Sequence, residues 1–214
     1  MDLFDDLERA AGIQALAPGA ALLRGFARDA APLLLAAIDD IAAVAPFRHL
    51  TTPGGHTMSV ATTSCGALGW HSDAEGYRYT ARDPDSHRAW PAMPACFLQI
   101  AQQAATCAGF PGYAPDACLI NRYAPGARLT LHQDRNERRV DAPIVSVSLG
   151  IPAVFLFGGL RRNDPTQKLR LVHGDVLVWG GPSRLRFHGV QPLTHAEHPQ
   201  TGACRINLTF RTAG

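Results

Sequence analysis

The sequence contains no long apolar run and no paired-cysteine motif. Its longest clean apolar stretch, around residues 30–38, is far too short to span a bilayer. The five cysteines are odd in number and include no Cys-x-x-Cys, which argues against a disulfide framework and against a thiolate zinc site. Residues 1–8 are acidic, unlike the start of a signal peptide. We therefore expect a cytoplasmic protein with reduced thiols and no membrane partner.

The sequence also lacks the short glycine-rich motifs of nucleotide-binding enzymes. It has no P-loop, no Gly-x-Gly-x-x-Gly that opens a helix, no internal repeat and no low-complexity tract. These absences argue against kinases and nicotinamide-dependent enzymes. A content of 46% apolar and 18% charged residues is typical of a globular chain. The 214 residues suffice for one domain, with two small domains as the alternative.

The small net charge of +2 conceals two halves of opposite sign. Residues 1–120 hold 7 Lys and Arg against 12 Asp and Glu, a net charge of −5. Residues 121–214 hold 13 against 6, a net charge of +7. Such an excess favours a polyanionic partner, although any one arginine can equally serve as a solvated surface residue.

Helices are expected at two places in the first half of the chain. One covers residues 33–44 and is closed by Pro46, and the other covers about 94–107 and stops at Gly109. Apolar residues of the first recur at the spacing of one helix face.

Strands dominate the rest of the pattern. Residues 48–90 contain one strand-like piece at 57–63 and otherwise indicate loop. From residue 116 onward, eight short β-runs are broken by Pro and Gly, at 117–122, 128–131, 144–149, 153–157, 169–172, 175–179, 185–190 and 204–211. Runs of this length and spacing predict an α+β chain that is mainly β, built as a sandwich or jelly roll.

A His-x-Asp motif occurs three times, at residues 71–73, 132–134 and 173–175, so the motif alone decides little. The second copy ends an expected strand, where residues two apart face the same side and can share a metal. The first copy lies in a polar stretch that indicates a loop. The third lies between two apolar runs, as a hairpin turn would. We therefore expect His132 and Asp134 to be the ligands.

Two further features support that choice. His188 lies on a later expected strand and completes two histidines and one carboxylate, a set that suits non-haem Fe(II) because it leaves one face of the metal open. The strand at 204–211 places Arg205, Asn207, Thr209 and Arg211 on one face. Two guanidinium groups on one face match the carboxylates of an acidic co-substrate.

Taken together, these segments resemble the AlkB family of bacterial Fe(II)- and 2-oxoglutarate-dependent nucleic-acid demethylases. The likeness covers nearly the whole chain, and the Arg-x-Asn-x-Thr-x-Arg run is its most specific part. The motifs that carry it are Thr52-Pro-Gly-Gly55, Met58-Ser-Val60, Trp90-Pro-Ala-Met-Pro94, Asn121-Arg-Tyr-Ala-Pro-Gly126, His132-Gln-Asp134, Val145-Ser-Val-Ser-Leu-Gly150, Phe157-Gly-Gly-Leu160, His173-Gly-Asp175, Trp179-Gly-Gly181, His188 and Arg205-x-Asn-x-Thr-x-Arg211.

The resemblance implies a single catalytic domain over residues 1–214 with a double-stranded β-helix (jelly-roll) core. Residues 1–92 or so would supply an N-terminal helix and a nucleotide-recognition lid, about 93–115 a supporting helix, and about 116–214 the core. A monomer is the expected state.

The resemblance also implies the chemistry. His132, Asp134 and His188 would hold Fe(II) as the catalytic centre, with 2-oxoglutarate and O₂ as co-substrates. Oxidation of an N-methyl group on a base such as 1-methyladenine or 3-methylcytosine would release formaldehyde, with succinate and CO₂ as the other products. The implied 2-oxoglutarate contacts are Asn121, Tyr123, Arg205, Asn207, Thr209 and Arg211.

The implied partner is DNA, as a single strand or as a base flipped out of a duplex, with RNA as an additional candidate. Trp70 resembles the aromatic residue that stacks on the base in this family. Tyr77, Arg78 and Tyr79 lie in the segment that would form the lid, and Arg162 would contact the base or a phosphate.

The chain departs from the family pattern at two positions. Asn136 stands where an acidic residue is expected near the exocyclic amine of the base, and His56 stands where a tyrosine is expected. An amide can accept that hydrogen bond but adds no charge, so a cationic base would be attracted less strongly. Two alternatives stay open: an oxygenase of this type that acts on a protein or small molecule, and a non-catalytic jelly roll that binds a metal or nucleic acid.

Overall fold

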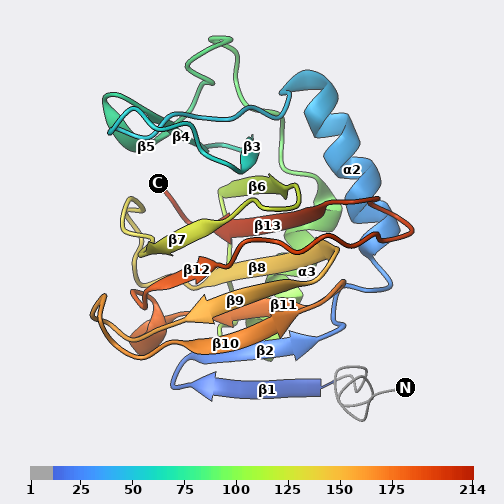
Figure 1. Ribbon diagram of the computed structural model, residues 1–214, viewed down its shortest axis with the longest axis vertical. Helices are drawn as coiled ribbons and strands as arrows, with labels where there is room; N and C mark the ends of the chain where they lie inside the picture. The colour runs from blue at the N-terminus through green and yellow to red at the C-terminus, as the bar shows by residue number, and fades with distance from the viewer. Residues whose placement is uncertain (1–11) are drawn as a thin grey trace.

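Two facing β-sheets form the core of the chain in the computed structural model, which describes residues 12–214 (Figure 1). The larger sheet has the order β1-β2-β11-β8-β13-β6-β3, and these strands span Gly12–Ala17, Ala20–Arg24, Val176–Trp179, Ile144–Gly150, Arg205–Arg211, Ala117–Tyr123 and Ala61–Gly66. The smaller sheet has the order β10-β9-β12-β7, spanning Gln167–Leu171, Ala153–Phe157, His188–Val190 and Leu129–His132. The expected jelly-roll core is confirmed. Residues 1–11 of the expected N-terminal part lie outside the described residues.

The central strands β8 and β13 separate two environments. Both are buried along their whole length, and successive side chains point to opposite faces of the sheet. Apolar residues such as Val147 and Leu208 join the core that the helices cover. On the other face, Asn207 of β13 lies opposite Ser148 of β8. The alternation therefore places a row of polar groups between the two sheets, where the site is found.

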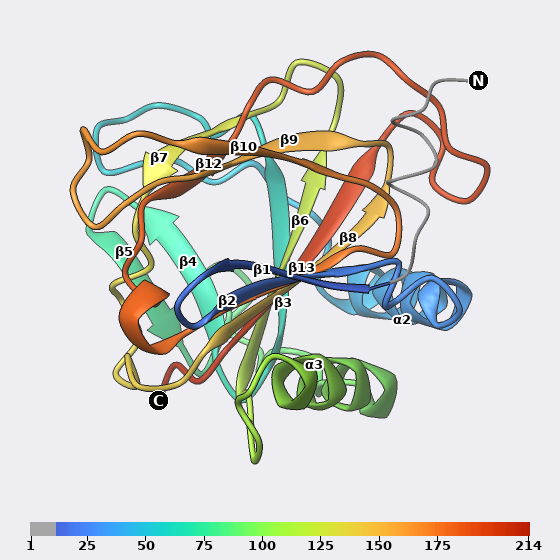
Figure 2. The ribbon, with the colours of Figure 1, turned by 90° about the horizontal axis from the view of Figure 1, so that it is seen from below.

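Helices α2 (Ala31–Val44) and α3 (Ala95–Cys107) cover the outer face of the larger sheet, as Figure 2 shows. Phe97 of α3 packs edge-on against Phe210 of β13, with ring centroids 5.8 Å apart. Both predicted helices are confirmed to within two residues. Within residues 12–214, no helix is long and apolar enough to cross a membrane.

The structure corrects the expectation of a loop at residues 71–73. β4 (Gly69–Asp73) and β5 (Gly76–Thr80) form a separate two-stranded sheet, the β4–β5 hairpin. Its turn is closed by a hydrogen bond from the main-chain N–H of Glu75 to Asp73 Oδ1 (2.9 Å), and Gly76 has φ +125°. Polar and aromatic residues occupy both faces of this hairpin, so the apolar alternation that marks a half-buried strand is missing.

Other expectations from the first half also need correction. The strand expected at 57–63 lies at Ala61–Gly66, and the hairpin of β1 and β2 has no counterpart among the expected strands. Its residues are rich in alanine, which has low strand propensity. Pairing of β2 with β11, in which Leu22 lies opposite Leu177, overrides that propensity.

Residues 173–175 form a connection between the sheets and not a hairpin turn. The preceding strand β10 belongs to the smaller sheet and the following strand β11 to the larger one. The buried Asp175 carboxylate fixes the connection because it accepts hydrogen bonds from Arg24 Nη1 (2.8 Å) and the main-chain N–H of Gly25 (2.9 Å). This copy of His-x-Asp is therefore structural.

A stacked pair of imidazoles next to this connection predicts a loss of stability in acid. The rings of His173 and His198 lie 4.2 Å apart, and His173 Nδ1 accepts a hydrogen bond from the main-chain N–H of Gly150 (3.0 Å). Burial, with smaller effects of His198 and Arg28, lowers the pKa of His173 to about 4. The folded state thus favours the neutral ring, so its contribution is present above pH 6.5 and is lost as the pH falls toward 4.

We expect this contribution to be about 1 kcal/mol, since His173 is only half-buried and water screens the effect. Urea unfolding of the metal-free protein between pH 4 and 7.5 measures it. A His173→Asn variant should show a shallower decline of unfolding free energy with falling pH than the wild type. Equal slopes for the two proteins would contradict the assignment.

Candidate active site

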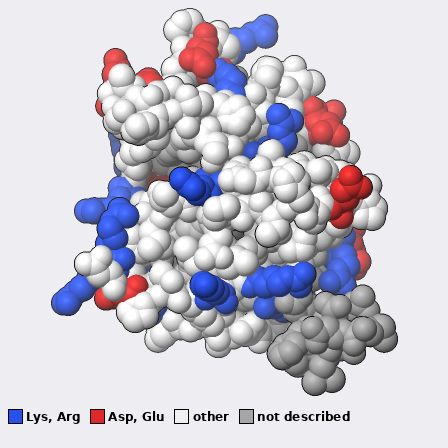
Figure 3. All heavy atoms as spheres, in the orientation of Figure 1, with Lys and Arg blue, Asp and Glu red and all other residues white. Residues whose placement is uncertain are grey.

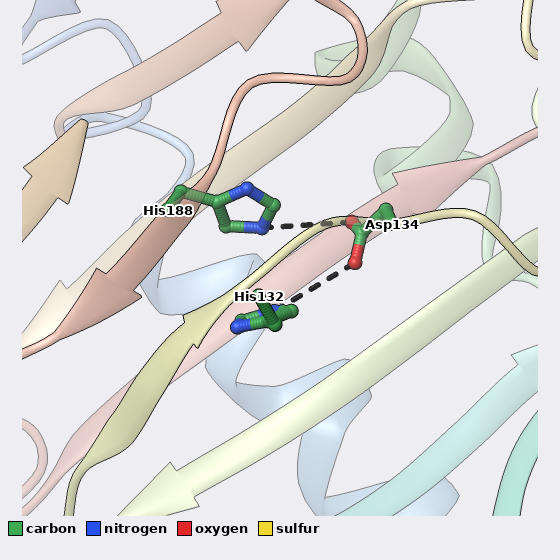
Figure 4. A group of neighbouring side chains, drawn as sticks. All are labelled: His132, Asp134 and His188. Carbon is green, nitrogen blue, oxygen red and sulfur yellow. Dashed lines mark ion pairs between the residues drawn. The ribbon is translucent and has the colours of Figure 1, made fainter. Parts of the chain in front are cut away.

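Three side chains that could share one metal ion meet where β7 and β12 pair (Figure 4). His132 ends β7 and lies directly opposite His188, the first residue of β12. Asp134 follows two residues after His132. The Asp134 carboxylate oxygens lie 3.7 Å from His132 Nε2 and 3.8 Å from His188 Nε2, and all three ligand atoms lie within 4.8 Å of one another. The spacings exceed hydrogen-bond length but suit a shared ion.

Main-chain carbonyls orient both imidazoles. His132 Nδ1 lies 2.8 Å from Thr130 O, and His188 Nδ1 lies 3.0 Å from Arg186 O. A proton on each Nδ1 leaves both Nε2 lone pairs directed at Asp134, as metal ligation requires. Burial, reinforced by the charge of His132, lowers the pKa of His188 to about 4. The ring is therefore neutral at pH 7.

An arginine holds the carboxylate ligand. Arg211 donates from Nε (2.9 Å) and Nη2 (2.7 Å) to Asp134 Oδ2, which leaves Oδ1 for a metal. Burial opposes ionisation of Asp134, but the charge of Arg211, helped by both histidines, outweighs it and keeps the pKa below its usual range. The two histidines and the carboxylate fit Fe(II) as a donor set.

Beside this group, two buried guanidinium groups each have nitrogen atoms without a hydrogen-bond acceptor among the described residues. Arg205 is 1% exposed and donates from Nη2 to Ser148 Oγ (3.0 Å), while its Nε and Nη1 have no hydrogen-bond partner among the described residues. Arg211 Nη1 is likewise buried without a partner. Burial lowers the pKa of Arg205, and neighbouring Tyr123 opposes the shift. Buried donors without a partner cost folding free energy, which a bound anion would offset. These nitrogens of Arg205 and Arg211 therefore form an anion-binding wall, and a dicarboxylate such as 2-oxoglutarate fits it.

A cavity of about 760 Å³ contains both groups. Its lining includes all three metal-ligand candidates and all six expected co-substrate contacts, namely Asn121, Tyr123, Arg205, Asn207, Thr209 and Arg211. Of the expected substrate contacts, four line it: Trp70, Tyr77, Asn136 and Arg162. Trp70 and Tyr77 stack in its wall with ring centroids 5.8 Å apart and an angle of 16° between the rings.

Two expected substrate contacts lie elsewhere. Arg78 does not line the cavity; it lies opposite His71 in the β4–β5 hairpin and donates to both oxygens of Asp73 at 2.6 Å. Asp73 is the carboxylate of the first His-x-Asp copy. Both of its oxygens accept hydrogen bonds from Arg78, so this carboxylate stabilises the hairpin. The Tyr79 hydroxyl instead donates to Glu137 Oε1 at 2.7 Å.

Glu137 and Arg184 have no counterpart among the residues expected from the sequence. They form an ion pair of 3.1 Å whose side chains are each 2% exposed. Arg184 Nη1 also donates to the main-chain carbonyl of Asp134 (2.9 Å). Glu137 lies in the charged run 135–139, which looks like a solvated loop, so no signal in the sequence distinguishes it.

Two exposed arginines, Arg128 and Arg162, belong to the cavity lining. In Figure 3, Lys and Arg gather along the left edge and the lower part of the face, while acidic residues lie mainly toward its top and right. Exposed basic residues on the strands and loops that contribute to the cavity lining are Arg128, Arg135, Arg138, Arg161 and Arg162. The positive half of the sequence therefore forms a surface that attracts polyanions.

Comparison with known proteins agrees with this geometry. The model of the 2OG-Fe(II) oxygenase superfamily matches residues 19–211. The chain is 58% identical to the alpha-ketoglutarate-dependent dioxygenase AlkB of Escherichia coli (strain K12) over 214 residues, which cover 100% of this chain and 98% of the relative. Its counterpart in Salmonella typhimurium is also 58% identical, over 213 residues, with the same shares covered.

A solved structure gives the same result for the fold. The structure of OsALKBH1 superposes with a TM-score of 0.82 at 28% identity, covering 94% of this chain and 99% of that one. The metal-ligand set, the anion-binding wall and the similarity over the full length all indicate the same family. The chain belongs to the AlkB family of Fe(II)- and 2-oxoglutarate-dependent dioxygenases.

Proposed function

We propose that this protein removes N-linked methyl groups from bases of the 1-methyladenine and 3-methylcytosine type in DNA, and also in RNA. It would consume O₂ and 2-oxoglutarate and release formaldehyde, succinate and CO₂. Relatives of lower identity support a nucleic-acid substrate by their names: a DNA N(6)-methyladenine demethylase of Arabidopsis thaliana and a tRNA demethylase of Schizosaccharomyces pombe.

The observation that carries the proposal is the convergence of three features on one cavity. The stacked Trp70 and Tyr77 form a flat aromatic wall, the metal-ligand group lies in the same cavity, and unpaired guanidinium donors line it as well. An aromatic face can receive a base that has left its stack. The exposed arginines of the same cavity lining, Arg128 and Arg162, together with Trp70, argue against a protein or small-molecule substrate.

Each residue can be given a role. His132, Asp134 and His188 would ligate Fe(II), which with 2-oxoglutarate supplies the oxidation of a C–H bond by O₂. Arg205 Nε and Nη1 would bind one carboxylate of the co-substrate and Arg211 Nη1 the other. Further co-substrate contacts would come from residues of the same cavity wall, namely Asn121, Tyr123, Asn207 and Thr209.

Asn136 would recognise the base through its amide oxygen. Its Nδ2 donates to the main-chain carbonyl of Tyr77 (3.2 Å), which leaves Oδ1 free to accept from an exocyclic amine. Arg162 donates to the main-chain carbonyl of Leu131 (2.8 Å) at the cavity edge, where its charge would attract a phosphate. We also propose that residues 1–214 act as one catalytic domain, as a monomer in the cytoplasm.

One assay tests the proposed function. The protein is supplied with Fe(II), 2-oxoglutarate and a single-stranded oligonucleotide that carries 1-methyladenine or 3-methylcytosine, and base mass and formaldehyde are measured. Loss of the methyl mass with stoichiometric formaldehyde is the expected result. Succinate without repair would favour an oxygenase with another substrate. Intact iron binding without any turnover would favour a non-catalytic protein.

Removal of the aromatic wall should weaken substrate binding selectively. Stacking contributes about 1–3 kcal/mol per base, so Trp70→Ala is expected to raise the KM for the methylated oligonucleotide about 10-fold or more. Trp70→Phe keeps an aromatic face and should recover most of the affinity. The KM for 2-oxoglutarate should stay unchanged in both variants. An unaltered oligonucleotide KM in Trp70→Ala would exclude stacking on this residue.

A further inference from the structure

We propose that Glu137 is a positioning residue that couples closure of the β4–β5 hairpin over the cavity to the orientation of Arg211 at the metal and co-substrate site. Its carboxylate is withdrawn from solvent, with a side chain that is 2% exposed. Oε2 lies 3.1 Å from Arg184 Nη2. Oε1 accepts from the Tyr79 hydroxyl at 2.7 Å and lies 3.3 Å from Arg211 Nε.

A single oxygen thus joins two parts of the molecule that are far apart in the sequence. Tyr79 belongs to the β4–β5 hairpin, whereas Arg211 belongs to the central strand β13 of the larger sheet. Arg211 in turn holds Asp134, so three successive contacts connect the hairpin to a metal-ligand candidate. Contacts this close within a buried, low-dielectric network depend on one another.

Charge balance makes Arg211 dependent on Glu137. The buried cluster contains the carboxylates of Asp134 and Glu137 and the guanidinium groups of Arg184 and Arg211, so its formal charges cancel. Asp134 and Glu137 together engage Nε and Nη2 of Arg211, which leaves Nη1 without a partner in the cavity wall. Glu137 thereby helps to present that donor to an anionic co-substrate.

Other hydrogen bonds also hold the hairpin: Ser72 Oγ donates to the main-chain carbonyl of Thr51 (2.7 Å), and Trp90 Nε1 donates to the main-chain carbonyl of Thr80 (3.0 Å). Among residues 12–214, β4 and β5 pair as strands only with each other, and a two-stranded sheet is marginally stable by itself. The hydrogen bond from the Asn136 side chain to Tyr77 O is longer, at 3.2 Å, and solvent-exposed. The part-buried Tyr79–Glu137 hydrogen bond differs from these contacts because its acceptor oxygen also contacts Arg211, so it is the link through which the site can affect the position of the hairpin.

The coupling acts in both directions. A co-substrate on Arg211 fixes the guanidinium and with it the Glu137 oxygen that receives Tyr79, which favours the closed hairpin. A closed hairpin in turn completes the hydrogen bonding of Glu137 and favours the arrangement of Arg211 that binds the co-substrate. Linkage requires the two effects to be equal, and couplings of this kind typically change affinity about 5- to 150-fold.

Tyr79→Phe tests the inference because it removes only the hydroxyl. The matched control is Tyr113→Phe, which removes another buried tyrosine hydroxyl, one without a hydrogen-bond partner and outside the cavity lining. Mn(II) replaces Fe(II) to prevent turnover. Hydrogen exchange of the backbone amides in residues 69–80 is followed with Mn(II) alone and with Mn(II) plus 2-oxoglutarate.

In the wild type and in Tyr113→Phe, 2-oxoglutarate is expected to slow exchange in the hairpin about 10-fold. In Tyr79→Phe the slowing should fall below 2-fold, while the Mn(II) affinity stays unchanged. Glu137→Gln should lose the same protection and also weaken 2-oxoglutarate binding, because Arg184 and Arg211 then lack a counter-charge. Wild-type protection in Tyr79→Phe would overturn the inference.

A second arm rests on the proposed function and uses the methylated oligonucleotide. The oligonucleotide should tighten 2-oxoglutarate binding about 10-fold in the wild type and less than 2-fold in Tyr79→Phe. Equal tightening in both proteins would also overturn the coupling. Failure of the oligonucleotide to bind wild-type protein would count against the proposed substrate alone, since the hydrogen-exchange arm contains no nucleic acid.

Discussion

Replacing His132 by alanine is expected to reduce formaldehyde release to less than about one thousandth of the wild-type rate while leaving the fold intact. The variant keeps only Asp134 and His188 as ligands, too few to hold Fe(II) with the co-substrate in place. Among the three candidates His132 has the most exposed side chain, at 37%, so its removal leaves little cavity. Iron binding, product release and thermal unfolding are the measurements.

His195→Ala is the control for this prediction. His195 is an exposed histidine outside the cavity lining, so its removal should alter neither iron binding nor turnover. Retained turnover in His132→Ala would refute the assignment of the metal ligands. Loss of turnover together with loss of the thermal transition would instead point to a damaged fold, which the exposure of the ring argues against.

Replacing Arg205 by methionine is expected to have opposite effects on co-substrate binding and on stability. Two charge-assisted hydrogen bonds to a carboxylate would be lost, so the KM for 2-oxoglutarate should rise about 100-fold or more. The protein without ligands should nevertheless become more stable, by about 1–3 kcal/mol, because a buried guanidinium with two unpaired nitrogens is replaced by a shorter, uncharged apolar chain.

The paired measurements are 2-oxoglutarate kinetics and urea unfolding of the metal-free protein. Arg122→Met is the matched control, since Arg122 lies on the neighbouring strand opposite Ile206 and is exposed, over the ring of Phe47 at 4.5 Å. It should leave the KM unchanged and bring no gain in stability. An unchanged KM in Arg205→Met would remove Arg205 from the co-substrate site.

Much of the core could be predicted because its strands carry local patterns. β8 and β13 alternate apolar and polar residues, and this alternation alone places Arg205 and Arg211 on one face. The two hairpins of the first half could not be predicted in the same way. β1 and β2 are alanine-rich and become strands because β2 pairs with β11 and β1 with β2, and β4 and β5 lack an apolar face.

The roles of single charged residues also could not be predicted from the local sequence pattern. Arg78 and Tyr79 are neighbours in the sequence, yet β-strand geometry sends them to opposite faces of the hairpin, one to Asp73 and the other to Glu137. Glu137 resembles a surface residue in the sequence, but it is buried against Arg184, which lies 47 positions later in the chain. Burial of a charge depends on distant partners, which the local sequence does not contain.

The sequence by itself determined the chemistry that this protein can perform. It contains two histidines and an aspartate suited to iron, and an alternating strand of arginine, asparagine and threonine suited to a dicarboxylate. The position of the second His-x-Asp copy at the end of an expected strand already favoured it, and only the tertiary structure decided how the other two carboxylates are used and where the third ligand lies. Asp73 is committed to Arg78 and Asp175 to Arg24, while pairing of β7 with β12 brings His188 opposite His132. The physical reason is that a metal site needs a third ligand, and only long-range strand register can deliver it.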